Sequence, residues 1–271
     1  MLRAMACVAT MARSIPVASR SLLHTPTVVS SADGTKVEAL IVPKDWQSSA
    51  LRENIAADAF VPFMRAVIAF AEEEAGLTNY HLRFCANPSA ATATKLGLAK
   101  LEDATLAAAE QAQCCVLLAG DRLPVREVAR APALEGLGCP IEYTDAKGKR
   151  VSLPDLCQQD LLVGEGESAR VFLDAQGRAM YVAVLKRFVR RQSELSDAEL
   201  GELWRLPIEL AFAHHESGMV DARLNAGGFQ NIAHLHLKVW VREEEFVERW
   251  ADQRVFKALR RSGSPTWQEQ T

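Results

Sequence analysis

The chain has 271 residues, of which 49% are hydrophobic and 24% are charged, and its formal net charge is −3. This composition is that of an ordinary globular protein, long enough for one large domain or two small ones. It excludes nucleic-acid binding through bulk positive charge, although a local basic patch stays open. No apolar run is long enough to span a bilayer. We therefore expect no membrane span and no specific nucleic-acid partner.

The N-terminal segment 1–32 is rich in Ser, Ala and Thr, contains Arg3, Arg13 and Arg20, and has no acidic residue. Such an amphipathic, Arg-rich and acid-poor segment is typical of a transit peptide, and it lacks the continuous apolar core of a secretory signal. We predict import into the mitochondrial matrix, with the plastid as second choice and cleavage between Arg20 and Ala32. A disordered tail of the same composition is the alternative.

In residues 33–140 the pattern indicates an α/β domain. Strands are expected over 36–43, over 80–85 (which could pair with the first) and over 114–119, with an amphipathic helix over 56–75. Residues 89–113 are Ala-rich and helical in pattern, with a break at Gly97. Pro and Gly are densest between residues 121 and 140, where we place the domain boundary.

A second domain is expected over residues 141–261, followed by a flexible tail over 262–271. A hairpin over 141–153 opens it, and strands follow over 169–174 and 179–185. Ser196-Asp197-Ala198-Glu199 is a capping box that starts a helix reaching residues 216–218, with Pro207 as a kink or restart. A strand over 220–225 and a helix over 243–261 complete an α+β fold with an antiparallel sheet.

The stretch 227–241 is the most informative in the chain. Its odd positions from Ala233 to Val241 are all apolar, whereas its even positions carry His234, His236 and Lys238. Side chains of a strand alternate between its two faces, so the pattern predicts one buried face and one face loaded with polar groups. The Gly227-Gly228 pair before it permits a sharp turn or a close approach of backbone to a ligand.

The two histidines of this stretch have other readings. Zinc would need one or two further ligands, and the sequence nearby supplies none. They could also be surface histidines without function, although the flanking Gly-Gly-Phe-Gln-Asn argues against this. The six cysteines have no zinc-type spacing, Cys114 and Cys115 are expected in the core, and a disulfide framework is not expected. We therefore predict no metal and no cofactor.

Residues 160–245 resemble a histidine-triad (HIT) domain in the order of their elements and in several motifs. The motifs are Val171-Phe172-Leu173-Asp174, Val184-Leu185-Lys186-Arg187-Phe188-Val189, Leu195-Ser196-Asp197-Ala198-Glu199-Leu200, and Phe229-Gln230-Asn231-Ile232-Ala233-His234-Leu235-His236-Leu237. The resemblance implies a HIT-like antiparallel sheet with helices. It also implies that a nucleotide or nucleotide conjugate is attacked at its α-phosphate by His236, giving a nucleotidyl-histidine that water or a second substrate resolves.

The same resemblance assigns roles to other residues. His234, Lys238 and Gln230 would assist the chemistry around His236, with Gln230 near the leaving group. Nucleotide-binding roles would fall to four residues, with Asp174 on the ribose: Asp174, Lys186, Asn225 and Asn231.

Four positions depart from the family pattern. The third histidine is Lys238, the histidine after Pro-Lys is Phe188, and the proline of that motif is Leu185. The family histidine that opens the same strand falls near Met180. A charged lysine cannot accept a proton, although it can contact phosphate oxygens as a point charge. Galactose-1-phosphate uridylyltransferases also vary the third position, where they have Gln, and Val239-Trp240 is similar to their ending.

The N-terminal half could be a degenerate second HIT-like unit, since Leu40-Ile41-Val42-Pro43-Lys44 resembles the Ile-Pro-Lys strand end. The sequence thus predicts a HIT-like nucleotide hydrolase or nucleotidyltransferase. The alternative is a catalytically reduced HIT-like protein that binds nucleotide or serves as a structural subunit of a mitochondrial complex. A homodimer or membership of a larger assembly is compatible with either function.

Overall fold

The computed structural model describes residues 22–24, 26–44, 46, 51–86, 109, 112–124, 142–144, 150–152, 161–174, 177–230 and 234–252. Most of the expected transit peptide, of the Ala-rich segment 89–113 and of the boundary region 121–140 lies outside these ranges, as does the whole tail 262–271. Within the described ranges, no helix is both long and apolar enough to cross a membrane.

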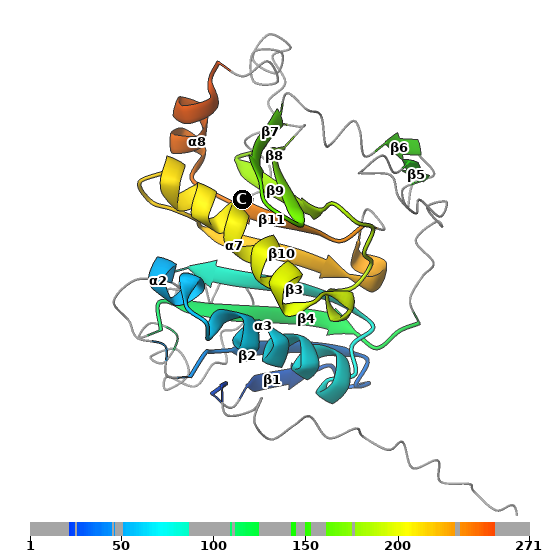
Figure 1. Cartoon of the computed structure of the whole chain (residues 1–271). Coiled ribbons are helices and arrows are strands. Elements are labelled where there is room, and N and C mark those ends of the chain that lie inside the picture. The colour runs from blue at the N-terminus through cyan, green and yellow to red at the C-terminus, as the bar shows by residue number, and fades with distance from the viewer. Residues whose placement is uncertain are drawn as a thin grey trace, which may run out of the picture.

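A nine-stranded sheet in the order β1-β2-β4-β3-β10-β11-β9-β8-β7 forms the body of the protein, and every neighbouring pair is antiparallel (Figure 1). The expected α+β class with an antiparallel sheet is therefore confirmed. The strands are β1 (Thr27–Ser30), β2 (Lys36–Ile41), β3 (Asn79–Ala86), β4 (Cys114–Asp121), β7 (Leu162–Glu165), β8 (Ala169–Leu173), β9 (Met180–Leu185), β10 (Asp221–Ala226) and β11 (His236–Trp240). The hairpin expected over 141–153 is the separate pair β5 (Glu142–Thr144) and β6 (Arg150–Ser152).

Two halves of the sheet share one connectivity. The hairpin β1–β2, the helices α2 (Leu51–Ala56) and α3 (Phe60–Ala69), and the hairpin β3–β4 give the spatial order β1-β2-β4-β3. The hairpin β8–β9, the helix α7 (Asp197–His214) and the hairpin β10–β11 give the matching order β8-β9-β11-β10. The two halves meet where β3 pairs with β10, so a single sheet runs through both.

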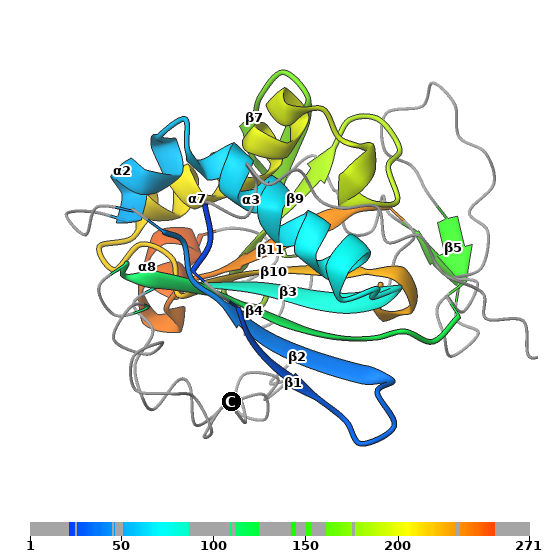
Figure 2. The same ribbon diagram turned by 90° about the horizontal axis from the view of Figure 1, so that it is seen from below.

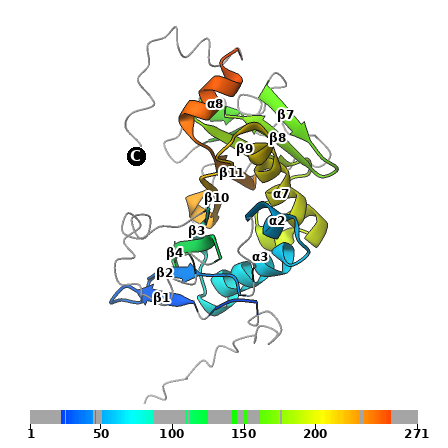
Figure 3. The same cartoon turned by 90° about the vertical axis from the view of Figure 1, so that its left-hand side faces the viewer.

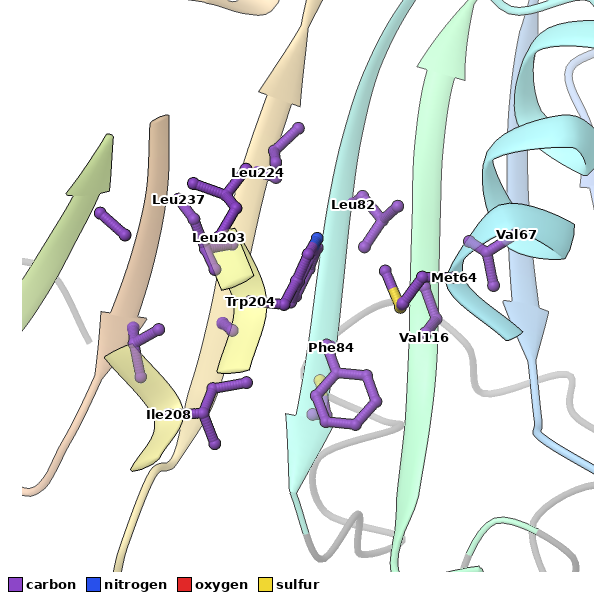
Figure 4. Packing of buried hydrophobic residues seen from close by; sticks show 14 of the residues in the cluster. Met64, Val67, Leu82, Phe84, Val116, Leu203, Trp204, Ile208, Leu224 and Leu237 are labelled. Atoms are coloured by element: carbon purple, nitrogen blue, oxygen red, sulfur yellow. The ribbon is translucent and has the colours of Figure 1, made fainter. Parts of the chain in front are cut away.

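Helices α2, α3 and α7 cover one face of this sheet, as the turned views show (Figures 2 and 3). Trp204 of α7 is fully buried and contacts Phe84 of β3 edge-on, with ring centroids 6.2 Å apart. Figure 4 shows Trp204 among Leu82, Phe84 and Leu224 of the sheet, with Met64 and Val67 of α3 close by. The core is therefore continuous across the β3–β10 junction, which lets the hydrophobic effect hold both halves together.

The helix α7 begins as the sequence predicts. The side chain of Ser196 accepts a hydrogen bond from the backbone N–H of Glu199, and the Glu199 side chain accepts one from the backbone N–H of Ser196. Pro207 does not restart the helix, which runs unbroken from Asp197 to His214, so of the two alternatives expected at this position the restart is wrong. The proline ring is buried, and packing on the sheet compensates for the hydrogen bond that proline cannot donate.

Three other expectations need correction. The helix expected over 56–75 is interrupted at residues 57–59, where Arg205 of α7 donates to the carbonyls of Ile55 and Ala57 and so satisfies the end of α2. Its last part is a π-helical turn, η1 (Phe70–Glu74). The strand over 80–85 does not pair with the first, because β4 lies between β2 and β3.

The third correction concerns residues 227–241, which do not form one strand. Residues Gly227–Phe229 form a 3₁₀ turn, η4, with Gly227 at φ +61°, and β11 begins only at His236. A side chain at Gly227 would meet the carbonyl oxygen of Thr78, so only glycine suits this left-handed turn. The final helix, α8, is described over Glu243–Trp250, and the rest of the range expected to 261 lies almost wholly outside the described residues.

We predict that Ser196→Ala lowers the free energy of unfolding by about 1 kcal/mol, because the first turn of α7 loses its side-chain cap. Urea unfolding at pH 7 measures the difference. Ser193→Ala is the control, since Ser193 is exposed in the short 3₁₀ turn η3 (Gln192–Glu194) just before the helix. Equal stabilities of the two variants would contradict a stabilising role for the cap.

Candidate functional site

The polar face of the sheet is centred on β10 and β11. In the register of the sheet, Arg223 lies opposite Lys238 on one side and opposite Arg83 on the other. His236 precedes Lys238 by two residues and so points to the same face, away from the helices. Leu224 and Leu237 point to the helix-covered face (Figure 4). The predicted division of this strand into an apolar and a polar face is confirmed.

His236 is oriented by one main-chain hydrogen bond. Its Nδ1 lies 3.1 Å from the carbonyl oxygen of His234, and its side chain is buried with only 5% of the residue exposed. A carbonyl oxygen can only accept, so Nδ1 carries the proton. In the neutral ring Nε2 therefore holds the lone pair, and the imidazole presents a nucleophilic nitrogen on the side away from His234.

The environment keeps this ring neutral. Burial is the largest effect that lowers the pKa of His236, and the charges of Lys238 and Arg178 act in the same direction, bringing the pKa to about 3. The bond to the carbonyl of His234 opposes them only in part. At neutral pH the unprotonated form is therefore the populated one, as a nucleophile requires.

His234 has a different environment. Its Nδ1 accepts a hydrogen bond from the backbone N–H of Val189 at 3.3 Å, and its Nε2 donates to the carbonyl of Leu185 at 2.9 Å. The ring is 2% exposed and stacks on Phe188, with centroids 5.6 Å apart. With both nitrogens bonded to main chain, His234 fixes the loop after β9 to the start of β11 and holds the carbonyl that orients His236.

Lys238 and Arg178 bring positive charge to the site. Burial lowers the pKa of Lys238, as does the charge of Arg178, whereas the Asp174 carboxylate raises it. Asp174 is buried and accepts from Arg178 through both carboxylate oxygens, at 2.8 and 2.9 Å. No hydrogen bond or ion pair of the Lys238 ammonium is found among the described residues. The third position of the motif is thus a fixed cation beside the nucleophile candidate.

The remaining predicted site residues are dispersed. Gln230 is buried and donates to the carbonyl of Arg190 at 2.9 Å, on the loop that His234 also holds. Lys186 bonds to the carbonyl of Gly166 and to Glu165, at the β7–β8 hairpin. Asn225 accepts a 2.7 Å hydrogen bond from Nδ1 of His81 on β3. Asn231 lies outside the described residues.

Several residues of this face were not predicted from the sequence. Asp221 is 1% exposed and bonds to Arg83 and to Arg223, and His81 stacks on Phe229 with centroids 4.3 Å apart and planes 2° apart. The period-two alternation of His81 with Arg83, and of Asp221 with Arg223 and Asn225, was visible in the sequence. Only the pairing of β3 with β10 brings the two sets together.

In the described part of the chain, no group of three or more His, Cys, Asp or Glu side chains could hold a metal ion. The two-histidine metal reading also lacks support within the site, because both nitrogens of His234 are already bonded to main chain. Cys85, Cys114 and Cys115 are buried free thiols, so the expected core placement of Cys114 and Cys115 is confirmed.

Neither a protein-family model nor a curated protein matches this sequence. Among solved structures, a uridylyltransferase and a uridylyltransferase mutant are similar at 15% identity and TM-score 0.45 each; the alignments cover 75% and 80% of this chain and 62% and 71% of theirs. A DUF4931 family protein from Bacillus cereus is similar at 8% identity and TM-score 0.39, with 84% of this chain and 88% of that one covered. This chain thus spans less than two thirds of the first uridylyltransferase.

We predict that the buried His236 makes folding sensitive to acid. Its pKa is lowered on folding, so below about pH 6.5 the unfolded chain binds a proton that the folded site does not bind until about pH 3. Stability is therefore lost as pH falls through this window, and His236 contributes about 1.4 kcal/mol per pH unit. Urea unfolding measures the free energy of unfolding of the wild type and of His236→Asn at pH 7, 6 and 5. The difference between the two proteins should change with pH at this slope.

The exposed His24→Asn is the matched control, and its unfolding free energy should follow that of the wild type at each pH. Parallel curves for the wild type and His236→Asn would contradict a neutral, buried imidazole. Burial also lowers the pKa values of His214, His215 and His234. Because the wild type and His236→Asn share these three histidines, their contribution to the pH dependence cancels when the two unfolding free energies are subtracted.

Proposed function

We propose that this protein is a HIT-like nucleotide hydrolase or nucleotidyltransferase that acts at a nucleotide α-phosphate through a nucleotidyl-histidine at His236. The observation that carries the proposal is the hydrogen bond from His236 Nδ1 to the His234 carbonyl, which leaves Nε2 with a lone pair in a buried ring that stays neutral. A neutral imidazole oriented from its other nitrogen is the form that attacks phosphorus.

The reaction has two steps. In the first, Nε2 of His236 attacks the α-phosphorus, a P–N bond forms, and the P–O bond to the leaving group breaks with its electron pair. The positive charge on the ring is stabilised because Nδ1–H stays bonded to the His234 carbonyl. In the second step, water or an acceptor hydroxyl attacks phosphorus and gives its proton to solvent, or an acceptor phosphate attacks through an anionic oxygen that has no proton to lose. The P–N bond breaks, and its electron pair returns to Nε2.

Lys238 and Arg178 would provide the electrostatic contribution. Lys238 is two residues from His236 on the same face of β11, and the charges of Lys238 and Arg178 both act on the His236 ring, so they would also stabilise the negative charge of a phosphoryl group bound there. Burial and the charge of Arg178 lower the pKa of Lys238, and the negative charge of a bound phosphoryl group would oppose this and keep the ammonium charged. A charged lysine cannot take a proton from water or from a hydroxyl, so transfer to an acceptor phosphate, which attacks through an anionic oxygen, is favoured over hydrolysis.

Under this proposal His234 is a positioning residue, since its carbonyl orients His236 and its ring is bonded to main chain. Gln230 would contribute to the leaving-group side from the same loop. Nucleotide contacts by Asp174, Lys186, Asn225 and Asn231 remain part of the proposal. In the structure, Asp174, Lys186 and Asn225 each bond to another group of the protein. Each would have to bind the nucleotide in addition to that group or in place of it.

The N-terminal half is proposed to be a degenerate second HIT-like unit. Its strand order β1-β2-β4-β3 and its helices between β2 and β3 have the same connectivity as β8-β9-β11-β10 with α7. In it, β4 takes the position of β11 and carries Cys114-Cys115-Val116 in place of histidines. Import into the mitochondrial matrix, the plastid being second choice, is proposed from the composition of residues 1–32.

A second candidate function is that of a catalytically reduced HIT-like protein, either nucleotide-binding or a structural subunit of a mitochondrial complex. The observation that favours it is that several polar side chains of the predicted site already bond to other groups of the protein. His234 bonds to two main-chain groups, Asp174 to Arg178, and Asn225 to His81. A homodimer or a larger assembly is compatible with either candidate.

We predict that the protein, incubated with adenosine phosphoramidate, diadenosine polyphosphates or nucleotide sugars, forms a nucleotidyl adduct on His236. Rapid acid-free quenching and intact-mass analysis would show the added nucleotidyl group, and peptide mapping would locate it. His236→Ala should lose the adduct and reduce turnover by on the order of a thousandfold or more, because no other group supplies the attacking electron pair.

His81→Ala is the control, since it removes an imidazole from the same sheet face without touching the nucleophile candidate. It should keep the adduct on His236. Absence of both turnover and adduct with all three substrate classes would reject the enzyme and leave the second candidate, for which nucleotide binding by calorimetry is the next measurement.

A further inference from the structure

Two arginines face each other across the centre of the sheet. Arg83 of β3 and Arg223 of β10 are direct cross-strand partners, and Lys238 of β11 is the next residue in the same row. Like charges directly opposite each other destabilise a sheet. Three cations in a row on three adjacent strands therefore cost stability, and the fold alone does not require them.

Asp221 organises the two arginines but does not neutralise the row. The carboxylate is buried, and it accepts from Arg83 Nε at 2.7 Å and from Arg223 Nε and Nη2 at 2.9 and 3.0 Å. One arginine would balance the negative charge of this carboxylate. The second arginine and Lys238 leave an excess of two positive charges, and only Asp221 bonds to both guanidinium groups among the described residues.

Both guanidinium groups are oriented by hydrogen bonds to Asp221, and both side chains remain partly exposed. The Arg223 side chain is 43% exposed and lies over the Trp240 ring at 5.1 Å from its centroid, and the Arg83 side chain is 28% exposed. In the described part of the chain, Nη1 of each arginine has no acceptor within hydrogen-bonding distance. Planar guanidinium donors that are already ordered lose little entropy when they bind an oxyanion.

The row lies close to His236. Lys238 is two residues along the same strand, about 7 Å away, and Arg223 lies on the neighbouring strand about 5 Å beyond, by ordinary strand spacing. Lysine and arginine side chains are long enough to cross these backbone separations, so Lys238 and Arg223 can reach a single ligand that also reaches His236.

We propose that Arg83 and Arg223, held by Asp221, form with Lys238 an anion subsite that binds a phosphoryl group beyond the one at His236. The ligand therefore carries a second phosphoryl group, either as the distal phosphate of the nucleotide or as the phosphate of an acceptor. The identity of the group at His236 rests on the proposed function, whereas the anion subsite does not need turnover to be present.

The test measures binding in a His236→Ala background, so that no reaction intervenes. Inorganic pyrophosphate is titrated by calorimetry against this protein and against versions that also carry Arg83→Met or Arg223→Met. Each added substitution should weaken binding about tenfold, the loss expected for one charge-assisted hydrogen-bonded contact. Arg52→Met is the matched control, since Arg52 pairs with Glu209 in the helical layer, away from the polar face. It should leave binding unchanged.

Two further arms identify the source of the phosphoryl group. If it is the distal phosphate, ADP and UDP bind more tightly than AMP and UMP, and the difference disappears in Arg83→Met and Arg223→Met. If it belongs to an acceptor, glucose 1-phosphate binds in the presence of saturating AMP or UMP and is lost in the same variants. Arg223→Lys keeps the charge but loses the planar fork, and it should bind with intermediate affinity while keeping Asp221 paired.

The anion subsite is overturned if folded Arg83→Met and Arg223→Met proteins bind pyrophosphate as tightly as the Arg52→Met protein. Folding is checked by thermal melts, and single substitutions are used because each leaves Asp221 with one arginine. Pyrophosphate binding that depends on the arginines, together with no nucleotidyl adduct in the wild type, would keep the subsite and reject the proposed reaction. The two failures are thus distinguishable.

Discussion

The pairing of β3 with β10 is the contact on which the rest of the structure depends. It is the hydrogen-bonded junction between the described strands β1-β2-β4-β3 and β10-β11-β9-β8-β7. Its register places Leu82 opposite Leu224 and Arg83 opposite Arg223. Because successive side chains alternate between faces, a slip of one residue would exchange the core under Trp204 for a row of cations. Burial of that core therefore fixes the register of the polar face as well.

Two histidines at the start of β11, His236 in the strand and His234 just before it, differ in chemical role because their local environments differ. Both rings are buried and both have lowered pKa values, mainly because of burial. His234 satisfies both nitrogens with main-chain groups of the loop after β9, which compensates for the cost of burying it. His236 has only its Nδ1 bonded in this way. His234 thus has a structural role, whereas His236, two residues later, is a candidate nucleophile.

The features that could be predicted from the sequence are those encoded locally. The alternation over 235–241, the capping box at Ser196 and the strands expected over 169–174, 179–185 and 220–225 each depend on residues close together in the chain, and the structure has them. The partners of the site residues could not be predicted. Asp221 meets Arg83 across 138 positions and Asn225 meets His81 across 144, and Gln230 bonds to a carbonyl that no motif marks. Neither periodicity nor motif spacing specifies how distant strands pair.

Lys238 connects these observations. It is two residues from His236 on β11 and directly opposite Arg223 on β10, so its charge acts on the candidate nucleophile and is also part of the row of cations. A histidine there would be mostly neutral at pH 7 and could accept a proton from water, but it would supply no fixed charge. A lysine supplies charge and cannot serve as that base while it is protonated. Its lowered pKa reflects burial and the repulsion of Arg178, a cost that a bound phosphoryl group would offset. Under the proposed function, the departure at the third position therefore favours holding a phosphorylated partner over activating water.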